Sequence, residues 1–390
     1  MKKHTKIILC SILVLMGCSK NANSPLISDI NKQTIQAPND INIFTSQDSL
    51  LSFINIIPLE TKENCLISKV VSIKIKDSLI YINSGRTDLY VFDFDGNYKS
   101  KIGSKGQGPG EYLELRDFIF TKDGNIEILD FRKIETYSLD GGHLKTKRFD
   151  FLKKDLYSNP VNFCLSPISG YYIWGGMIGL NDEQLRGGSY MMHHMSEDMN
   201  ITSSYFLVGN GDGGMKDRFR YYNDTILVIP YLLDYNVYQI DESGDISTRY
   251  NIDFGKYGIT SKISSPEERG DISLLNQSDY VTNLSDYVES DSWIHVKFTY
   301  KNLIYSLLYS KEKNESYFVS MAKPFDNELR FYPVSLSHEN KLVSIIDAYW
   351  LLEELDRITP EGIKRWNLEK YKNLNESDNP VLIFYTLKKP

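Results

Sequence analysis

The feature that most constrains the fold is a repeat of four short strands. Tyr90–Gly96 and Ile134–Gly141 each end an alternating apolar-polar strand in an Asp-Gly turn, and the two turns lie 45 residues apart. Glycine accepts the positive φ that such hairpin turns require. Four strands in a unit of about 40–50 residues are typical of a β-propeller blade.

The repeat accounts for most of the chain. The clearest units cover 69–102 and 115–149, looser units follow at 162–207, 221–252 and 281–319, and a split unit takes in 327–346 and 381–388. We expect the strand 53–59 to pair with the split unit, since this closes the ring and removes the open edges. The sequence therefore predicts an all-β, six-bladed propeller of four-stranded antiparallel blades, with short helices at 342–358 and 360–370.

The N-terminus has the pattern of an export signal. Three lysines precede an apolar run of about ten residues, too short for a spanning helix, which needs about 20. Leu15-Met16-Gly17-Cys18 resembles the lipobox of bacterial lipoproteins, which implies cleavage before Cys18 and lipid attached to it. The expected organisation is a signal peptide at 1–17, a polar tether at 18–42 and the propeller at 43–390. An ordinary secreted protein is the alternative.

Charge and cysteine content limit the partners and the compartment. The formal charge is −7, and it becomes −10 without residues 1–17, which hold three lysines and no acid. This acidic balance argues against nucleic acid as a partner. Cys65 and Cys164 both lie in apolar stretches, so we expect two buried free thiols, with a single disulfide as the alternative.

One stretch also carries a family resemblance. The glycine-rich run 102–112, which follows Val91–Gly96, resembles the six-bladed β-propeller lipoproteins of Bacteroides and relatives, as do Pro58–Thr61 and Asn379–Leu382. These proteins are similar in architecture to NHL-type propellers. The resemblance implies the fold and a place in the cell envelope, and it implies no shared activity.

The glycine-rich loop is the first candidate site. It lacks both the Gly-Lys-Ser/Thr of a P-loop and the helix of a dinucleotide fingerprint, so nucleotide binding is disfavoured. We interpret it as a joint between two blades. Loops of this kind can lie on the face beside the funnel, which makes Glu111, Arg116 and Asp117 candidates for ligand contacts.

A second candidate is the polar-aromatic group around Arg218 and Arg220, which includes Tyr221 and Tyr222 and could suit a sugar or a peptide. The alternative interpretation is an ordinary blade edge.

Other motifs give weaker indications. Met191–Met195 contains two histidines and suits a soft metal, but such residues more often fill gaps in a core. His295 lies in an apolar strand pattern and is expected to pack there. The loop 209–214 lacks the glutamate of an EF-hand. No metal ligand set and no catalytic motif is recognisable, and the cofactor stays unknown.

These features predict a lipid-anchored, extracytoplasmic propeller that acts as a non-catalytic binding module. Its ligand would be a glycan or a peptide, or it would join an envelope protein complex. The alternative is a hydrolase or lyase whose active residues converge in the central funnel from several blades. Residues 19–23 lack an acidic cluster, which favours the periplasmic side of the outer membrane.

Overall fold

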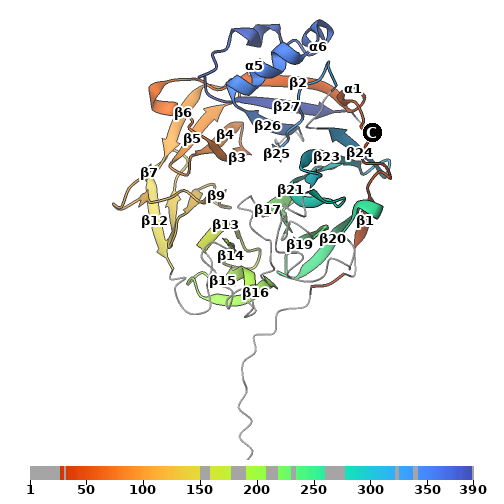
Figure 1. Cartoon of the computed structure of the whole chain (residues 1–390). Coiled ribbons are helices and arrows are strands. Elements are labelled where there is room, and N and C mark those ends of the chain that lie inside the picture. Colours follow the sequence, from red (N-terminus) through yellow and green to blue (C-terminus); the bar gives the residue numbers. More distant parts are fainter. Residues whose placement is uncertain are drawn as a thin grey trace, which may run out of the picture.

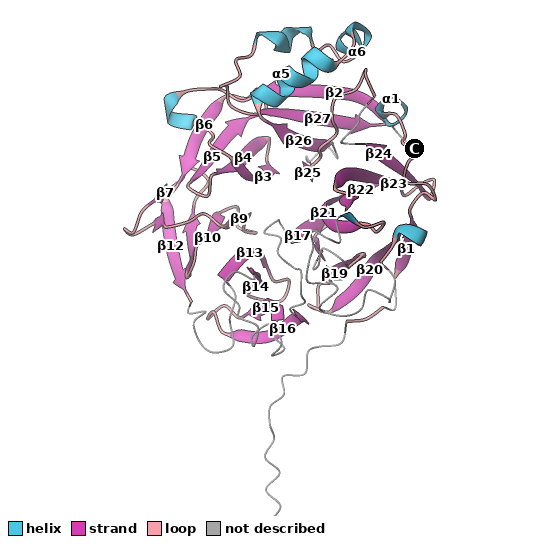
Figure 2. Ribbon diagram, in the orientation of Figure 1, coloured by secondary structure: helices cyan, strands magenta, loops and turns pink. Residues whose placement is uncertain are grey.

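The computed structural model describes residues 27–29, 32–149, 159–176, 190–207, 218–229, 234–259, 277–320, 325–336 and 341–388. Within these residues six four-stranded antiparallel units form a ring, as Figure 1 shows, so the predicted six-bladed propeller is confirmed. Helices are few. Most of the helical residues belong to the C-terminal part of the chain and lie on the outer side of the blade that contains its last strand (Figure 2). None of the described helices is both long enough and apolar enough to cross a bilayer.

The first three blades follow the chain order. Blade 1 comprises β3 (Val70–Lys76), β4 (Leu79–Ser84), β5 (Asp88–Asp93) and β6 (Tyr98–Ile102). A small parallel pair, β7 (Ser104–Lys105) and β8 (Glu111–Tyr112), joins it to the next blade. Blade 2 comprises β9 (Asp117–Phe120), β10 (Ile126–Leu129), β11 (Lys133–Tyr137) and β12 (His143–Arg148). Blade 3 comprises β13 (Asn159–Leu165), β14 (Tyr171–Gly176), β15 (Tyr190–Met195) and β16 (Ile201–Leu207).

Blade 4 gains a strand from the N-terminus. It comprises β17 (Phe219–Tyr222), β18 (Thr225–Val228), β19 (Asn236–Ile240), β20 (Ile246–Asp253) and the parallel outer strand β1 (Gln33–Gln36). A short 3-10 helix, η2 (Gly255–Tyr257), follows it. Blade 5 comprises β21 (Thr282–Glu289), β22 (Trp293–Tyr300), β23 (Leu303–Ser310) and β24 (Glu315–Ser320).

Blade 6 closes the ring. It comprises β25 (Ser335–Leu336), β26 (Leu342–Ile346), β27 (Val381–Leu387) and β2 (Leu51–Pro58), with β2 antiparallel to β27. The predicted pairing of the two chain ends is therefore confirmed. The helices are α1 (Gln47–Leu50), η1 (Glu63–Cys65), α5 (Ala348–Arg357), α6 (Pro360–Arg365) and η3 (Glu369–Asn373). The expected strand at 327–335 is wrong except at its end, because only Ser335–Leu336 pairs with β26.

The segment expected as a polar tether partly packs on the ring. Within 18–42, strand β1 pairs with β20, and the side chains of Ile35, Ala37 and Ile41 are buried. The next residues cross blade 5, where Phe44 stacks on Tyr305 with ring centroids 5.6 Å apart. The described part of this segment is thus a strap across blades 4 and 5 because its apolar residues find a core to bury in.

The core is divided among the blade junctions. Within the described residues, six clusters of buried apolar side chains each join two neighbouring blades. Strands such as β4 and β5 are therefore buried on both faces. The junction of blades 1 and 2 includes Tyr112, and the Tyr137 hydroxyl donates to the Gly110 carbonyl at 2.7 Å. The glycine-rich loop is thus a joint between blades, as interpreted from the sequence.

Candidate functional site

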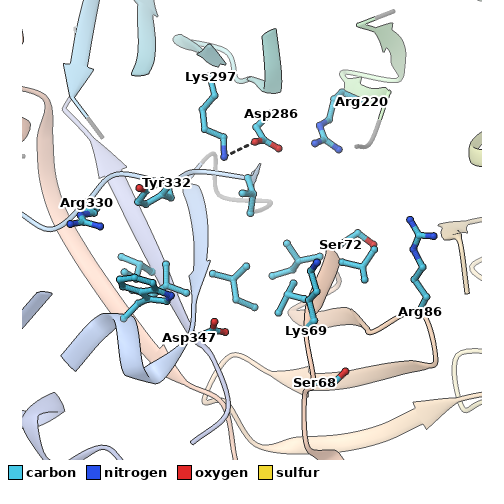
Figure 3. Close-up of a pocket in the computed structure, with 18 of the residues that line it drawn as sticks. Ser68, Lys69, Ser72, Arg86, Arg220, Asp286, Lys297, Arg330, Tyr332 and Asp347 are labelled. Atoms are coloured by element: carbon cyan, nitrogen blue, oxygen red, sulfur yellow. Dashed lines mark ion pairs between the residues drawn. The ribbon is translucent and has the colours of Figure 1, made fainter. Parts of the chain in front are cut away.

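A cavity of about 880 Å³ opens at the centre of the ring (Figure 3). Each blade contributes to its wall, through the inner strands β3, β13, β17 and β21 and the segments just before β9 and β25. Propeller geometry causes this convergence, because the first strand of every blade faces the axis. This central cavity, the funnel, is the candidate site.

Blades 1 and 2 place three cations together at the funnel wall, and we name them the cation cluster: Lys69, Arg86 and Arg116. The Glu114 carboxylate links two of them, with Arg86 Nη1 at 2.6 Å and Arg116 Nη2 at 3.1 Å. Lys69 makes no ion pair with any described residue. One carboxylate among three cations leaves an excess of positive charge at the wall.

A tight turn holds Arg86 in position. Gly85 and Arg86 both have positive φ, +59° and +63°, in the hairpin turn between β4 and β5. The Thr87 amide donates to the Ser84 carbonyl at 3.0 Å, and the Arg86 amide donates to Asn83 Oδ1 at 3.1 Å. A left-handed conformation costs a non-glycine residue about 1–2 kcal/mol. Such a conformation persists only where the surrounding contacts hold it in place, as the two hydrogen bonds do here.

The Arg116 side chain is nearly buried, with 8% of it exposed. Its Nη1 donates to the Pro160 carbonyl of blade 3 at 2.7 Å, and its guanidinium lies 3.6 Å from the Phe131 ring centre. Burial lowers the pKa of Arg116, and the Glu114 carboxylate opposes this shift. Its Nε and the Ser72 hydroxyl, both at the funnel wall, are buried without a hydrogen-bond partner among the described residues.

Blades 4 and 5 form another part of the wall. Lys297 Nζ pairs with Asp286 Oδ2 at 2.5 Å, and both side chains are nearly buried. Arg220 Nε donates to the Tyr287 carbonyl at 3.2 Å, which directs the guanidinium from β17 towards blade 5. In Figure 3 the Lys297–Asp286 pair and Arg220 lie along one edge of the cavity.

Blade 6 supplies the remaining wall from the segment before β25 and from α5. Arg330 Nε lies 3.0 Å from Glu354 Oε1, and Glu354 also pairs with Arg357 at 2.9 Å. Tyr332 and the half-exposed Trp350 add aromatic surface to this side. The Asp347 residue that precedes α5 also lines the funnel.

The charge of the funnel is opposite to that of the chain. Six cationic and three acidic side chains line it within the described residues, a net charge of +3, or +2 when Glu114 is included. The whole chain has a formal charge of −7. A concave site of one sign concentrates its field and attracts ligands of the other sign. The arrangement therefore suits an anion.

The structure separates the five residues expected to bind a ligand. Arg116 and Arg220 line the funnel. Glu111 turns back into its own loop and accepts from the Gly108 amide at 2.7 Å. Asp117 is 3% exposed and accepts from Lys74 Nζ at 2.8 Å, and Arg218 is buried with Nη1 donating to the Ile229 carbonyl at 3.2 Å. In the described structure, Glu111, Asp117 and Arg218 therefore make contacts within and between the blades and do not line the funnel.

Sequence reasoning missed several residues of the wall. Lys69, Arg86, Lys297 and Arg330 were not singled out, although each adds a positive charge to the funnel. The one local signal is Gly85-Arg86, where arginine occupies a turn position that favours glycine or asparagine. The others occupy ordinary strand or loop contexts, and only ring closure brings them together.

The histidine motifs have structural partners. His193 is buried, with Nδ1 2.9 Å from the Ser204 hydroxyl, and burial lowers its pKa to about 4. His194 Nε2 lies 3.0 Å from the Ser166 hydroxyl. His295 is buried in β22, as expected, with Nε2 3.0 Å from the Ser306 hydroxyl. Among the residues described, no three His, Cys, Asp or Glu are placed to hold a metal ion.

Cys65 and Cys164 are both buried and free, so the free-thiol expectation is confirmed. The loop 209–214, considered for calcium, lies outside the described residues.

Comparison with known families gives a match over most of the chain. DUF4934, described as a domain of unknown function, matches residues 29–386. The match begins before β1, so it includes the strap. A comparison with curated proteins found no match.

One of the solved structures that the chain resembles confirms the fold. A protein from Bacteroides fragilis, provisionally described as exported, has a TM-score of 0.73 at 20% identity, over 92% of this chain and 100% of that chain. A protein of unknown function from Bacteroides caccae has a TM-score of 0.41 at 11% identity, over 65% and 81%. The WD40 domain of Neurospora crassa Pan2 has a TM-score of 0.40 at 11% identity, over 72% and 74%. The likeness to NHL-type propellers stays a prediction.

Proposed function

The chain belongs to the DUF4934 family, and we propose that it is an extracytoplasmic binding module that takes an anionic ligand in its central funnel. The observation that carries the proposal is the net positive charge of the funnel in an acidic chain. The glycan and peptide ligands expected from the sequence fit this proposal in their acidic forms.

Two details of the wall support a recognition role. Asp286 and Glu354, two of the three carboxylates that line the funnel, are held in ion pairs with basic side chains. Lys69 is exposed and lacks an ion pair among the described residues, so its ammonium group is available to a ligand. Arginine and lysine at a partly dehydrated wall bind carboxylate, sulfate or phosphate groups strongly.

The test is calorimetric binding to the chain without residues 1–17. Trigalacturonic acid and tetraglutamate are compared with the neutral maltotriose and tetraglycine. At least one acidic ligand should bind and its neutral counterpart should not. Its affinity should fall when the salt is raised from about 20 to about 500 mM, because salt screens the attraction.

Two lysine variants locate the site. Lys69→Ala should weaken binding about tenfold, the usual effect of losing one charge-assisted hydrogen bond. Lys105→Ala is the matched control, since Lys105 is an exposed lysine in β7 away from the funnel. Equal binding of acidic and neutral ligands, or equal effects of the two variants, would refute the proposal. Release of cleavage products from a bound ligand would instead favour the hydrolase or lyase alternative.

We further propose that lipid on Cys18 anchors the module on the periplasmic side of the outer membrane. The support is the lipobox-like Leu15–Cys18 and the likeness to a provisionally exported protein. Cys18→Ala should move the protein from the membrane fraction to the soluble fraction. Retention of this variant on membranes would contradict the anchor.

A further inference from the structure

We infer that the ligand of the funnel is an amphipathic anion, in which an acidic group is joined to a compact apolar body such as an aromatic or fused ring. This inference rests on the proposed anion-binding function and names the chemical class of the ligand.

The first observation is an apolar wall on one side of the funnel, formed by Val70, Val71, Val334, Ile345, Ile346 and Trp350. All six belong to the neighbouring blades 1 and 6, in β3, in β26, in α5 and just before β25. Val70, Val334 and Ile345 pack with the same core cluster between these blades, so this part of the wall is continuous.

The second observation is that this wall is not buried by the protein itself. Val71 is 36% exposed and Trp350 is 51% exposed, and the other four side chains are partly exposed. Exposed apolar surface that is contiguous and concave usually marks a binding site, because covering it releases ordered water.

The third observation is an uneven distribution of apolar surface among the blades. Blades 2, 4 and 5 line the funnel with charged side chains only, namely Arg116, Arg220, Asp286 and Lys297. Blades 1 and 6 supply the apolar wall, together with Lys69, Arg86 and Arg330. In Figure 3, Arg86 and Arg220 lie on one side of the cavity, and Tyr332 and Arg330 lie on the other. The funnel thus has a charged side and an apolar wall that is edged by further cations.

These observations restrict the ligand. A wholly polar anion, such as an oligouronate, would satisfy the cations and leave the apolar wall facing water. A neutral apolar molecule would cover the wall but would remove water from the cations without replacing its hydrogen bonds, which is unfavourable. A ligand with one acidic end and one apolar body satisfies both sides. A cavity of about 880 Å³ has room for such a molecule.

Three related probes test the inference by calorimetry on the chain without residues 1–17. Naphthalene-2-sulfonate has both parts, methanesulfonate has the acidic group alone, and 2-naphthalenemethanol has the apolar body alone. Naphthalene-2-sulfonate should bind at one site, and each partial probe should bind at least about tenfold more weakly.

Variants on α5 and in the cation cluster show where the probe binds. Trp350→Ala should weaken naphthalene-2-sulfonate binding about fivefold to tenfold, and Trp350→Phe should restore most of it. Trp350 is half-exposed, so the alanine variant should fold. Tyr349→Ala, at the exposed neighbouring residue that does not line the funnel, should bind as the wild type does. Lys69→Ala should weaken binding of the sulfonate and not of the alcohol.

Each outcome distinguishes the inference from the function on which it rests. Equal affinity for the two sulfonates would overturn the amphipathic ligand and leave the anion site standing. Equal affinity for naphthalene-2-sulfonate and the alcohol would overturn the anion site and with it this inference. Absence of binding by all three probes would overturn both.

Discussion

Asp117 offers the sharpest test of how the funnel is supported. Its carboxylate lies in blade 2, accepts from Lys74 of blade 1 at 2.8 Å, and accepts from the Phe163 amide of blade 3 at 3.2 Å. It therefore links three inner strands beside the cavity. We predict that Asp117→Ala lowers the stability of the ring.

The size of the effect follows from burial. The Asp117 side chain is 4% exposed, and the Lys74 side chain is 25% exposed. Removing one partner of a buried ion pair costs about 3–5 kcal/mol. Lys74 keeps some access to water and also donates to the Phe118 carbonyl, which places Asp117→Ala near the lower end, at about 3 kcal/mol. Asp117→Asn keeps an acceptor oxygen and should cost about 1–2 kcal/mol.

Urea denaturation of the wild type, Asp117→Ala, Lys74→Met and the double variant measures these costs. The two single costs should not add, and the coupling free energy should be about 1–2 kcal/mol. Ligand affinity of the folded Asp117→Asn variant should match the wild type, because its carboxylate faces the blades. A stability change below about 0.5 kcal/mol in Asp117→Ala, the range of ordinary surface substitutions, would refute the reasoning.

Three further predictions concern the fold. Gly96→Ala should cost at least about 3 kcal/mol, because φ is +85° and a Cβ would meet the Pro58 carbonyl at 2.1 Å; Gly124→Ala, at φ +80° in open space, should cost only about 1–2 kcal/mol in the same urea assay. Ile35→Ala should cost about 2–4 kcal/mol if the strap is part of the core, and a cost near zero would contradict this. Burial lowers the pKa of His295 to about 3, so the contribution of this residue to stability should be complete above about pH 6.5 and should fall as the pH drops towards 3, by at most about 1.4 kcal/mol per pH unit. His295→Gln should reduce this loss of stability at acidic pH. An unchanged pH profile in the variant would refute the role of His295.

The fold could be predicted because its information is local and repeated. Each blade encodes its own strands and turns, and the units expected at 69–102 and 115–149 agree closely with blades 1 and 2, whose strands span 70–102 and 117–148. The strand expected at 327–335 was wrong because the local pattern there does not determine whether the segment pairs in a sheet. An apolar run there packs without pairing, because its residues contact α5 and the core of blade 6, and the sequence pattern does not distinguish packing from pairing.

The strap shows why composition misled at the N-terminus. Polar residues dominate 18–42, and the apolar ones, Ile35 and Ile41 among them, are too sparse to predict a strand. They are buried because β20 presents an open edge at the outside of blade 4, and β1 covers that edge in a parallel pairing. The partner lies more than 200 residues away, so no local pattern could indicate it.

The funnel is harder to predict because no two blades need to share a motif for their side chains to meet. Lys69, Arg116 and Arg220 are separated by 47 and 104 residues, yet all three line one cavity. The net charge of the whole chain can be read from the sequence. The anion-binding character becomes visible only when this charge is compared with the opposite charge of the funnel lining. An acidic chain that gathers cations at its axis bears an electrostatic cost that folding alone does not explain, since like charges repel in a compact state. Substituting Lys69 by a neutral residue should therefore leave the ring at least as stable while weakening anion binding, and these opposite effects distinguish a recognition surface from a structural one.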